Sequence, residues 1–232
     1  MNGVAMYERV ARVLPPRLVG PLDMIRPGVL SSWGGPLNGQ THRQRIVRDL
    51  ARTVAFDRVI ETGTFRGTST EFLAHVTGAP VSTVEASRRH FEFARRRFAG
   101  LPGIEVAQGD SRSFLRQQAA GRTDENTLFY LDAHWEEDLP LREELEIIDA
   151  SWPRAVVLVD DFQVPGDPGY AFDDYGRGKA LTASYLPPME GWGTYYPALP
   201  AAKETGARRG CVVLVSAPLR AAVDALDSVR PA

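Results

Sequence analysis

Cysteine is almost absent from this sequence of 232 residues, which contains Cys211 alone. A single thiol excludes an internal disulfide framework and a zinc site built from several cysteines. Because Cys211 opens the apolar run 211–215, we expect it to be an inert core residue. Long apolar runs are also missing: none approaches the ~20 residues that a membrane-spanning helix needs, and no signal peptide is visible. We therefore expect a cytoplasmic protein without a membrane partner.

The chain also lacks an excess of either charge. It has 27 Lys and Arg residues against 29 Asp and Glu residues, a net charge of −2, and an isoelectric point near 6.1. This balance argues against nucleic acid or an anionic membrane as a partner. Hydrophobic residues make up 44% of the sequence, which at this length is enough for one large globular domain with an ample core.

Residues 1–38 differ in character from the rest. Residues 4–14 predict one short amphipathic helix, which Pro15 and Pro16 would end, and further prolines and glycines make the remainder loop-like. Three roles stay open for this segment: a cap over an active site, a contact in a homodimer, or a lead-in. We assign residues 39–232 to the domain that carries the chemistry.

From residue 40 onward, short apolar runs alternate with helical periods. This alternation predicts an α/β fold with a doubly wound, mostly parallel sheet, here of seven strands with a C-terminal antiparallel hairpin. Helices are expected over residues 40–55, 67–76, 87–98, 111–119 and 139–150. In the last of these helices, we expect three glutamates to point outward: Glu143, Glu144 and Glu146. After a first strand that ends at Glu61, further strands are expected over residues 81–85, 104–107, 127–132, 155–160, 194–199 and 211–216.

The most informative stretch is residues 59–70, Val-Ile-Glu-Thr-Gly-Thr-Phe-Arg-Gly-Thr-Ser-Thr. It predicts a buried strand that ends at Glu61, a turn that Gly63 permits, and a helix that begins near Gly67. Hydroxyl side chains lie at the helix N-terminus, where free N–H groups carry a partial positive charge. Open α/β sheets bind nucleotide-like cofactors at such a strand–turn–helix unit.

A second carboxylate, Glu85, ends the next predicted strand. At that position it can accept both hydroxyls of a ribose. The glycine spacing is Gly-x-x-x-Gly rather than Gly-x-Gly-x-x-Gly, so the helix N-terminus need not hold a pyrophosphate. The pattern therefore favours a ligand with one nucleoside and no diphosphate over NAD.

These turns resemble the class I S-adenosylmethionine-dependent methyltransferases. In that family an E/D-x-G-x-x-x-G turn holds the methionine end of the cofactor, an acid after the second strand holds its ribose, and an acid after the third contacts its adenine. All three positions are matched in order, and the resemblance spans roughly residues 39–217. It implies S-adenosylmethionine as the cofactor, with contacts from Glu61, Gly63, Thr64, Gly67, Ser69, Glu85, Asp110 and Ser111. It further implies that the start of the first helix touches the carboxylate end of the cofactor through Gln40 and Thr41.

Two more predicted strands end in acids, one in Asp132 and the other in Asp160 with Asp161 behind it. Such carboxylates meet at one sheet edge and repel each other unless a cation such as Mg²⁺ neutralises them. The pattern resembles the metal-dependent O-methyltransferases, among them catechol O-methyltransferase and the sugar O-methyltransferases of macrolide tailoring. That resemblance implies that the three aspartates bind Mg²⁺ or another divalent cation. The alternative is that Asp160 and Asp161 cap a turn or a helix.

One position departs from that family. Catechol O-methyltransferase places a catalytic lysine three residues after the first metal aspartate, where this chain has Trp135. His134 is the nearest replacement, because an unperturbed pKa of about 6.5 suits a general base that takes the proton of an acceptor hydroxyl. The catalytic candidates are thus His134 and Asp132, although His134 would serve equally to hydrogen-bond a loop carbonyl. The other histidines are expected to be ordinary surface or helix-face residues: His42, His75 and His90.

A loop rich in glycine and proline follows Asp161. At residues 163–176 it is too long for a bare connector, which indicates a substrate lid or a pocket wall. Its aromatic side chains would either flank an acceptor ring or pack the loop onto the domain, and they are Tyr170, Phe172 and Tyr175. Trp135 is a further candidate for acceptor contact, and a second wall is expected from Trp192, Tyr195 and Tyr196. The loop's two acids are expected to be solvated: Asp173 and Asp174.

The leading hypothesis is an O-methyltransferase that depends on S-adenosylmethionine and a divalent metal. Its expected partner is a small hydroxylated acceptor, either a natural-product sugar or a phenol. A metal-independent methyltransferase with His134 as base keeps the same cofactor. An NAD-dependent oxidoreductase and a cofactor-binding module without catalysis are the alternatives from other classes. The spread of acids at the predicted chemical edge argues against the last of these.

Overall fold

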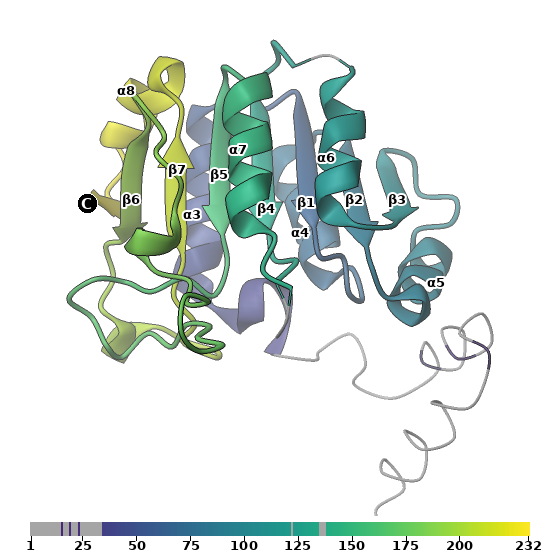
Figure 1. The fold of residues 1–232 in the computed structure, drawn as a ribbon, viewed down its shortest axis with the longest axis horizontal. Coiled ribbons are helices and arrows are strands. Elements are labelled where there is room, and N and C mark those ends of the chain that lie inside the picture. The colour runs from purple at the N-terminus through teal and green to yellow at the C-terminus, as the bar shows by residue number, and fades with distance from the viewer. Residues whose placement is uncertain (1–14, 16–18, 20–22, 24–33, 122, 135–137) are drawn as a thin grey trace, which may run out of the picture.

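In the computed structural model, which describes residues 15, 19, 23, 34–121, 123–134 and 138–232, one sheet lies between two layers of helices (Figure 1). The described residues form eight strands in the order β3-β2-β1-β4-β5-β7-β6-β8. The strands are β1 (Arg58–Thr62), β2 (Val81–Glu85), β3 (Ile104–Gln108), β4 (Thr127–Leu131), β5 (Ala155–Val159), β6 (Gly193–Pro197), β7 (Val212–Val215) and β8 (Val229–Pro231). The α-helices are α3 (Thr41–Thr53), α4 (Thr68–Thr77), α5 (Arg88–Arg97), α6 (Ser111–Ala119), α7 (Leu141–Ser151) and α8 (Arg220–Asp224).

The predicted doubly wound sheet with a C-terminal hairpin is confirmed. Strands β1 to β5 pair in parallel, whereas β7 runs antiparallel to both β5 and β6. The predicted number of seven strands was wrong, because β8 adds an antiparallel edge strand beside β6. Its three residues, Val-Arg-Pro, are too few to show the alternation that reveals a strand in sequence.

The central strands are apolar because both of their faces are covered. Every residue of β4 and β5 is buried. Helix α3 packs one face with Ile46 and Leu50, joined by Leu73 of α4. Helices α6 and α7 cover the opposite face, where Leu115 and Leu145 lie in a second core cluster. In Figure 1 the helices α6 and α7 lie in front of the sheet, and α3 and α4 lie behind it.

Most of residues 1–38 lie outside the described part of the chain, including the helix predicted over residues 4–14. Among those described, Val19 and Asp23 are buried. Asp23 forms a two-pronged ion pair with Arg89 of α5, through bonds of 2.7 and 2.9 Å. The division at residue 38 stays a prediction. Among the described residues, no helix combines the length and apolarity that crossing a membrane would require.

The strand order reverses between β1 and β4, which makes the carboxyl ends of these two strands a topological switch point. The loops after β1, β2, β4 and β5 meet there, with the segment before α3 and the long loop after β5 at the same lower edge of Figure 1. Backbone bonds hold the loops together: Gly63 N donates to Val84 O at 3.0 Å, and Asp132 N donates to Thr62 O at 2.9 Å.

The loops after β1 and β4 approach each other closely at Gly63, and a substitution there tests this packing. Gly63 has a φ of 89°, and a Cβ there would lie 2.2 Å from the carbonyl oxygen of Asp132. We expect Gly63→Ala to lower the free energy of unfolding by more than about 2 kcal/mol, because it adds a backbone clash to left-handed strain. The matched control is Gly78→Ala, with a φ of 66° and nothing in the described structure within 4 Å. It should lose only about 1 kcal/mol. Equal losses in urea unfolding would contradict this packing.

Candidate active site

The first acid of the candidate site, Glu61, is fully buried at the end of β1. Its Oε2 accepts hydrogen bonds from the hydroxyls of Thr70, at 2.5 Å, and Thr83, at 2.6 Å. Its Oε1 has no hydrogen-bond partner among the described residues. Burial raises the pKa of Glu61 to about 7. Because an unpaired buried acceptor is costly, a ligand N–H that reached Oε1 would be stabilised there.

Glu85 holds the turn that follows β1. The backbone N–H groups of Phe65 and Ser87 donate to its two carboxylate oxygens, each at 2.7 Å. Each oxygen keeps a second lone pair, so the carboxylate is still able to accept ribose hydroxyls. Burial raises the pKa of Glu85. Phe65 has a left-handed φ of 48°, which is rare for an aromatic residue, and its ring packs edge-on against His90 at 4.5 Å.

Three neighbouring residues that were predicted to bind the cofactor are engaged within the protein. The hydroxyl of Thr64 lies 2.6 Å from that of Thr83, and Ser69 Oγ accepts a backbone N–H from Leu37 at 3.1 Å. Gly67 precedes α4 with a φ of 74°, and a Cβ there would clash with an aromatic ring of the α5 region. The cofactor contacts of Thr64, Gly67 and Ser69 stay predictions.

Asp110 and Ser111, the predicted adenine contacts, begin α6. Asp110 caps this helix by accepting a hydrogen bond from Ser113 N at 3.0 Å. It also pairs with Arg112 at 2.6 Å, and this pairing lowers the pKa of Asp110. Ser111 is buried. The structure thus gives Asp110 a capping role, and the adenine contact stays a prediction.

Beneath this turn, the structure corrects the expectation that Glu144 points outward with Glu143 and Glu146. Glu144 is only 1% exposed, and its Oε1 has no partner among the described residues. Burial raises the pKa of Glu144 to about 7, although the hydroxyls of Ser111 and Thr62 oppose the shift. The physical reason is visible in the helical period: the buried positions of α7 are 141, 144, 145 and 148, which places Glu144 on the apolar stripe.

Gln40 and Thr41 bind the loop that precedes β7. The amide of Gln40 makes two bonds to the backbone of Arg209: its Nε2 donates to Arg209 O at 2.9 Å, and Arg209 N donates to its Oε1 at 2.7 Å. Thr41 N donates to Thr205 Oγ1 at 2.8 Å. Glu204 caps α3 by accepting the backbone N–H of His42 at 3.1 Å. These contacts use the polar groups that were expected to reach the cofactor, and that role stays a prediction.

Asp160 lies at the carboxyl end of β5, where it is 1% exposed and every side-chain lone pair has a donor. Its Oδ1 accepts from the guanidinium of Arg43 and from Asp161 N, and its Oδ2 accepts from the hydroxyl of Tyr130 and from Asn38 Nδ2 at 3.2 Å. Burial alone would raise the pKa of Asp160, but Arg43 and Tyr130 hold it below its usual range. In this conformation Asp160 belongs to an internal ion pair.

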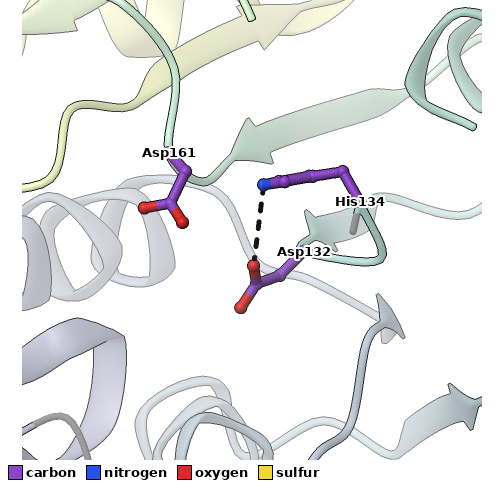
Figure 2. Close-up of side chains that lie close together, drawn as sticks. All are labelled: Asp132, His134 and Asp161. Carbon is purple, nitrogen blue, oxygen red and sulfur yellow. Dashed lines mark ion pairs between the residues drawn. The ribbon is translucent and has the colours of Figure 1, made fainter. Parts of the chain in front are cut away.

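Asp132 and Asp161 converge instead with His134 (Figure 2). One ligand atom from each of the three residues lies within 4.8 Å of the other two. His134 Nε2 is 3.9 Å from Asp132 Oδ1 and has no hydrogen-bond partner among the described residues. Burial and the charge of Asp160 raise the pKa of Asp132 and bring that of Asp161 to about 7. Burial lowers the pKa of His134, which is therefore neutral at pH 7.

Two loop residues complete the charged edge: Arg209, to which the sequence pattern assigned no role, and Asp173, which was expected to be solvated. Arg209 pairs with Asp161 at 2.7 Å and also with Asp173. Asp173 lies 3.6 Å from His134 Nε2, so the expectation that it is solvated was wrong. Arg43 is the third missed residue. A loop arginine and a buried helix arginine carry no local pattern, because their partners are remote in sequence.

The aromatic residues of the long loop divide between the two expected roles. Tyr170 is 2% exposed, and its hydroxyl donates to Leu199 O at 2.9 Å, so it packs the loop onto the domain. Tyr175 donates to Asp173, and Phe172 is half-buried. Their acceptor contacts stay predictions, and Trp135 lies outside the described residues. The expected second wall was wrong for Tyr195 and Tyr196, which are buried in the core.

Outside the site, two single-residue expectations are settled. His42 was expected on an ordinary helix face but is buried, with its Nε2 2.9 Å from Ser228 O. Cys211 is confirmed as a buried core residue, and burial raises the pKa of its thiol to about 11.

The internal ion pair predicts a large difference between two arginines of α3. We expect Arg43→Met to lower the free energy of unfolding by about 3–5 kcal/mol, because Asp160 is left as an uncompensated buried charge. Arg45→Met changes a residue whose side chain is 51% exposed in its pairs with Asp49 and Asp227, and it should have little effect. Urea unfolding at pH 7 compares the two, and a loss at Arg43 as small as that at Arg45 would contradict the assigned pair.

Glu144 predicts a pH-dependent gain in stability. Its pKa is about 7 in the folded state against an ordinary 4.5, so the native protein holds an extra proton and loses stability as the pH rises between these values. Glu144→Gln removes that cost. Its advantage over the wild type in free energy of unfolding should grow by roughly 2 kcal/mol from pH 5.5 to pH 8. The exposed neighbour provides the control, Glu143→Gln, and a pH-independent difference at Glu144 would sink the prediction.

Comparison with solved structures identifies the fold. The chain superimposes on cofactor-bound Rv0187 from MTB with a TM-score of 0.59, 20% identity, and 88% and 91% of the two chains covered. The O-methyltransferase from Bacillus cereus in complex with SAH gives a TM-score of 0.56 at 18% identity, covering 91% and 97%. TomG, an O-methyltransferase from Streptomyces achromogenes involved in tomaymycin synthesis and bound to SAM, gives 0.54 at 20%, covering 75% and 79%.

No protein-family model matches the sequence, and no curated protein matches it. At identities of 20% or below, the similarity to solved structures establishes the fold. This chain therefore has the fold of the S-adenosylmethionine-dependent O-methyltransferases.

Proposed function

We propose that this protein is an S-adenosylmethionine-dependent O-methyltransferase that methylates a hydroxyl of a small molecule with the aid of a divalent cation. The proposal is supported by two groups of side chains that lie at the carboxyl edge of the sheet, on opposite sides of the switch point. Glu61 and Glu85 lie on one side of the switch point, and the cluster of Asp132, His134 and Asp161 lies on the other. A cofactor and an acceptor bound on these two sides would meet at the switch point, where this fold class binds its ligands.

The cofactor side suits a nucleoside with a short charged tail. Glu85 offers two free lone pairs for ribose hydroxyls. The buried Oε1 of Glu61 offers an unpaired acceptor for an ammonium group. Gly63 lets the two loops approach without a side chain between them. The predicted adenine contact from the Asp110 turn completes this assignment.

The acceptor side suits a divalent cation. Asp132 and Asp161 supply oxygen donors, and His134 supplies a buried nitrogen without a partner among the described residues. A cation held there would lower the pKa of an acceptor hydroxyl and orient it toward the methyl group. The ligand set implied by the resemblance to metal-dependent O-methyltransferases also includes Asp160, but the lone pairs of Asp160 are occupied by Arg43, Tyr130 and Asn38.

Methyl transfer requires little further help, because the sulfonium methyl is already electrophilic. The protein must align acceptor oxygen, methyl and sulfur, and exclude the geometries that do not react. Such positioning supplies up to about 7–11 kcal/mol in ideal cases. The loop over residues 163–176 would serve this task, because the ion pair between Asp173 and Arg209 holds it at the edge of the cluster.

A metal-independent form is the second candidate, and one observation favours it. Arg209 already neutralises part of the acidic cluster through Asp161 and Asp173. His134 lies 3.6 Å from Asp173, which could orient its ring as a general base toward an acceptor hydroxyl. In this form His134→Ala would abolish turnover, whereas chelation would leave it unchanged.

Cofactor binding tests the part of the proposal that both forms share. Calorimetric titration with S-adenosylhomocysteine should show binding that Glu85→Gln weakens about 10- to 100-fold, through the loss of charge-assisted bonds to the ribose. Glu105→Gln, on the exposed side of β3, should bind like the wild type. A thermal melt of each variant checks that it is folded. Binding of NAD in place of S-adenosylhomocysteine would overturn the proposal in favour of an oxidoreductase.

A further inference from the structure

We infer that the cation site of this protein is a mixed nitrogen and oxygen site, formed by Asp132, His134 and Asp161, that selects a first-row transition metal over Mg²⁺. This inference rests on the metal-dependent form of the proposed function. It departs from the ligand set expected from the sequence, which was Asp132, Asp160 and Asp161. The ions of interest are Mn²⁺, Fe²⁺, Co²⁺, Ni²⁺ and Zn²⁺.

Asp160 is excluded as a metal ligand because its side-chain lone pairs are already occupied. Both of its oxygens accept two hydrogen bonds each, from Arg43, Tyr130, Asn38 and the backbone of Asp161. A metal ion would have to displace a guanidinium that is itself 1% exposed. Removing one partner from such a buried pair is strongly unfavourable. The two successive acids therefore have different tasks, with Asp160 facing inward and Asp161 facing the cluster.

His134 offers a nitrogen ligand atom to a cation in the cluster. Its side chain is 3% exposed, and its Nε2 is buried without a hydrogen-bond partner in the described structure. Figure 2 shows this nitrogen directed into the space between the two carboxylates. A buried nitrogen without a hydrogen-bond partner is energetically unfavourable, and coordination to a metal removes that cost. Neither aspartate reaches it at hydrogen-bonding distance, which leaves room for an ion between them.

The net charge around His134 and Arg209 is negative. The carboxylates of Asp132 and Asp173 lie within 4.0 Å of His134 Nε2, those of Asp161 and Asp173 pair with Arg209, and Arg209 brings one compensating positive charge. Two negative charges remain unbalanced when all the carboxylates are ionised. A divalent cation restores neutrality, whereas a monovalent ion would not.

The imidazole of His134 favours a transition metal over Mg²⁺. Mg²⁺ prefers oxygen ligands at near-ideal octahedral positions, whereas imidazole suits zinc, iron, copper and nickel. Three protein ligands from two adjacent strand ends leave positions open for an acceptor hydroxyl, as catalytic sites do. The exchange of a carboxylate for an imidazole therefore changes the metal preference without closing the site.

Metal binding by the full chain, free of any affinity tag and stripped with chelator, tests this inference. Titration with Co²⁺, followed by its visible absorption, should show one site, and competition should rank Zn²⁺ and Ni²⁺ at least roughly 100-fold tighter than Mg²⁺. His134→Ala should weaken Co²⁺ at least about 10-fold. His134→Asp should reduce the difference between the affinities for Co²⁺ and Mg²⁺. The control His75→Ala removes an exposed histidine of α4 and should leave the affinity unchanged.

Two results would overturn the inference: Mg²⁺ binding as tightly as Co²⁺, or His134→Ala retaining wild-type Co²⁺ affinity. Titration with S-adenosylhomocysteine on the same metal-free samples separates this failure from failure of the proposed function. A protein that binds S-adenosylhomocysteine but shows no histidine-dependent metal site keeps the methyltransferase proposal and loses the inference. A protein that binds Co²⁺ through His134 but does not bind S-adenosylhomocysteine keeps the metal site and loses the methyltransferase proposal.

Discussion

The buried ion pair between Arg43 and Asp160 joins helix α3 to the carboxyl end of β5 and determines how the rest of the acidic edge is arranged. A pair with both side chains 1% exposed is stabilised when hydrogen bonds satisfy its remaining polar groups. Tyr130 and Asn38 complete the donors to Asp160, and the carbonyls of Arg209 and Gly210 accept from Arg43, whose Nε alone in the guanidinium has no partner among the described residues. The pair therefore fixes the segment before α3, the β4 and β5 strands and the loop before β7 in one network.

Because Arg43 neutralises Asp160 inside the protein, it is the neighbouring Asp161 that lies with Asp132 and His134. Asp161 has a left-handed φ of 53°, and one of its carboxylate oxygens lies within 4.8 Å of the ligand atoms of Asp132 and His134. Leu37, Asn38 and Phe65 are also left-handed and lie in the loops of the same edge. Strained non-glycine residues of this kind persist only where their surroundings impose them, and they cluster at functional sites.

The strand ends were predictable from the sequence because each is an apolar run followed by an acid, as at Glu61, Glu85 and Asp132. Side-chain direction was not predictable at the double acid Asp160-Asp161, because it depends on Arg43, which is 117 positions away in sequence. Arg209 and Asp173 were missed for the same reason: loops bring them together 36 positions apart. Glu144 differs, because its place in the 141, 144, 145, 148 stripe was available in the sequence and was outweighed by its charge.

We propose that one sheet edge holds the cofactor through Glu85 and a metal through Asp132, His134 and Asp161. A crystal structure of the protein with S-adenosylhomocysteine and Co²⁺, using anomalous scattering at the cobalt edge, tests both halves at once. We expect ribose hydroxyls within hydrogen-bonding distance of Glu85 and one cobalt peak about 2.0–2.2 Å from His134 Nε2 and both aspartates. A cobalt peak bound by Asp160 with Arg43 displaced, or a nucleoside bound elsewhere than at Glu85, would rule out this arrangement.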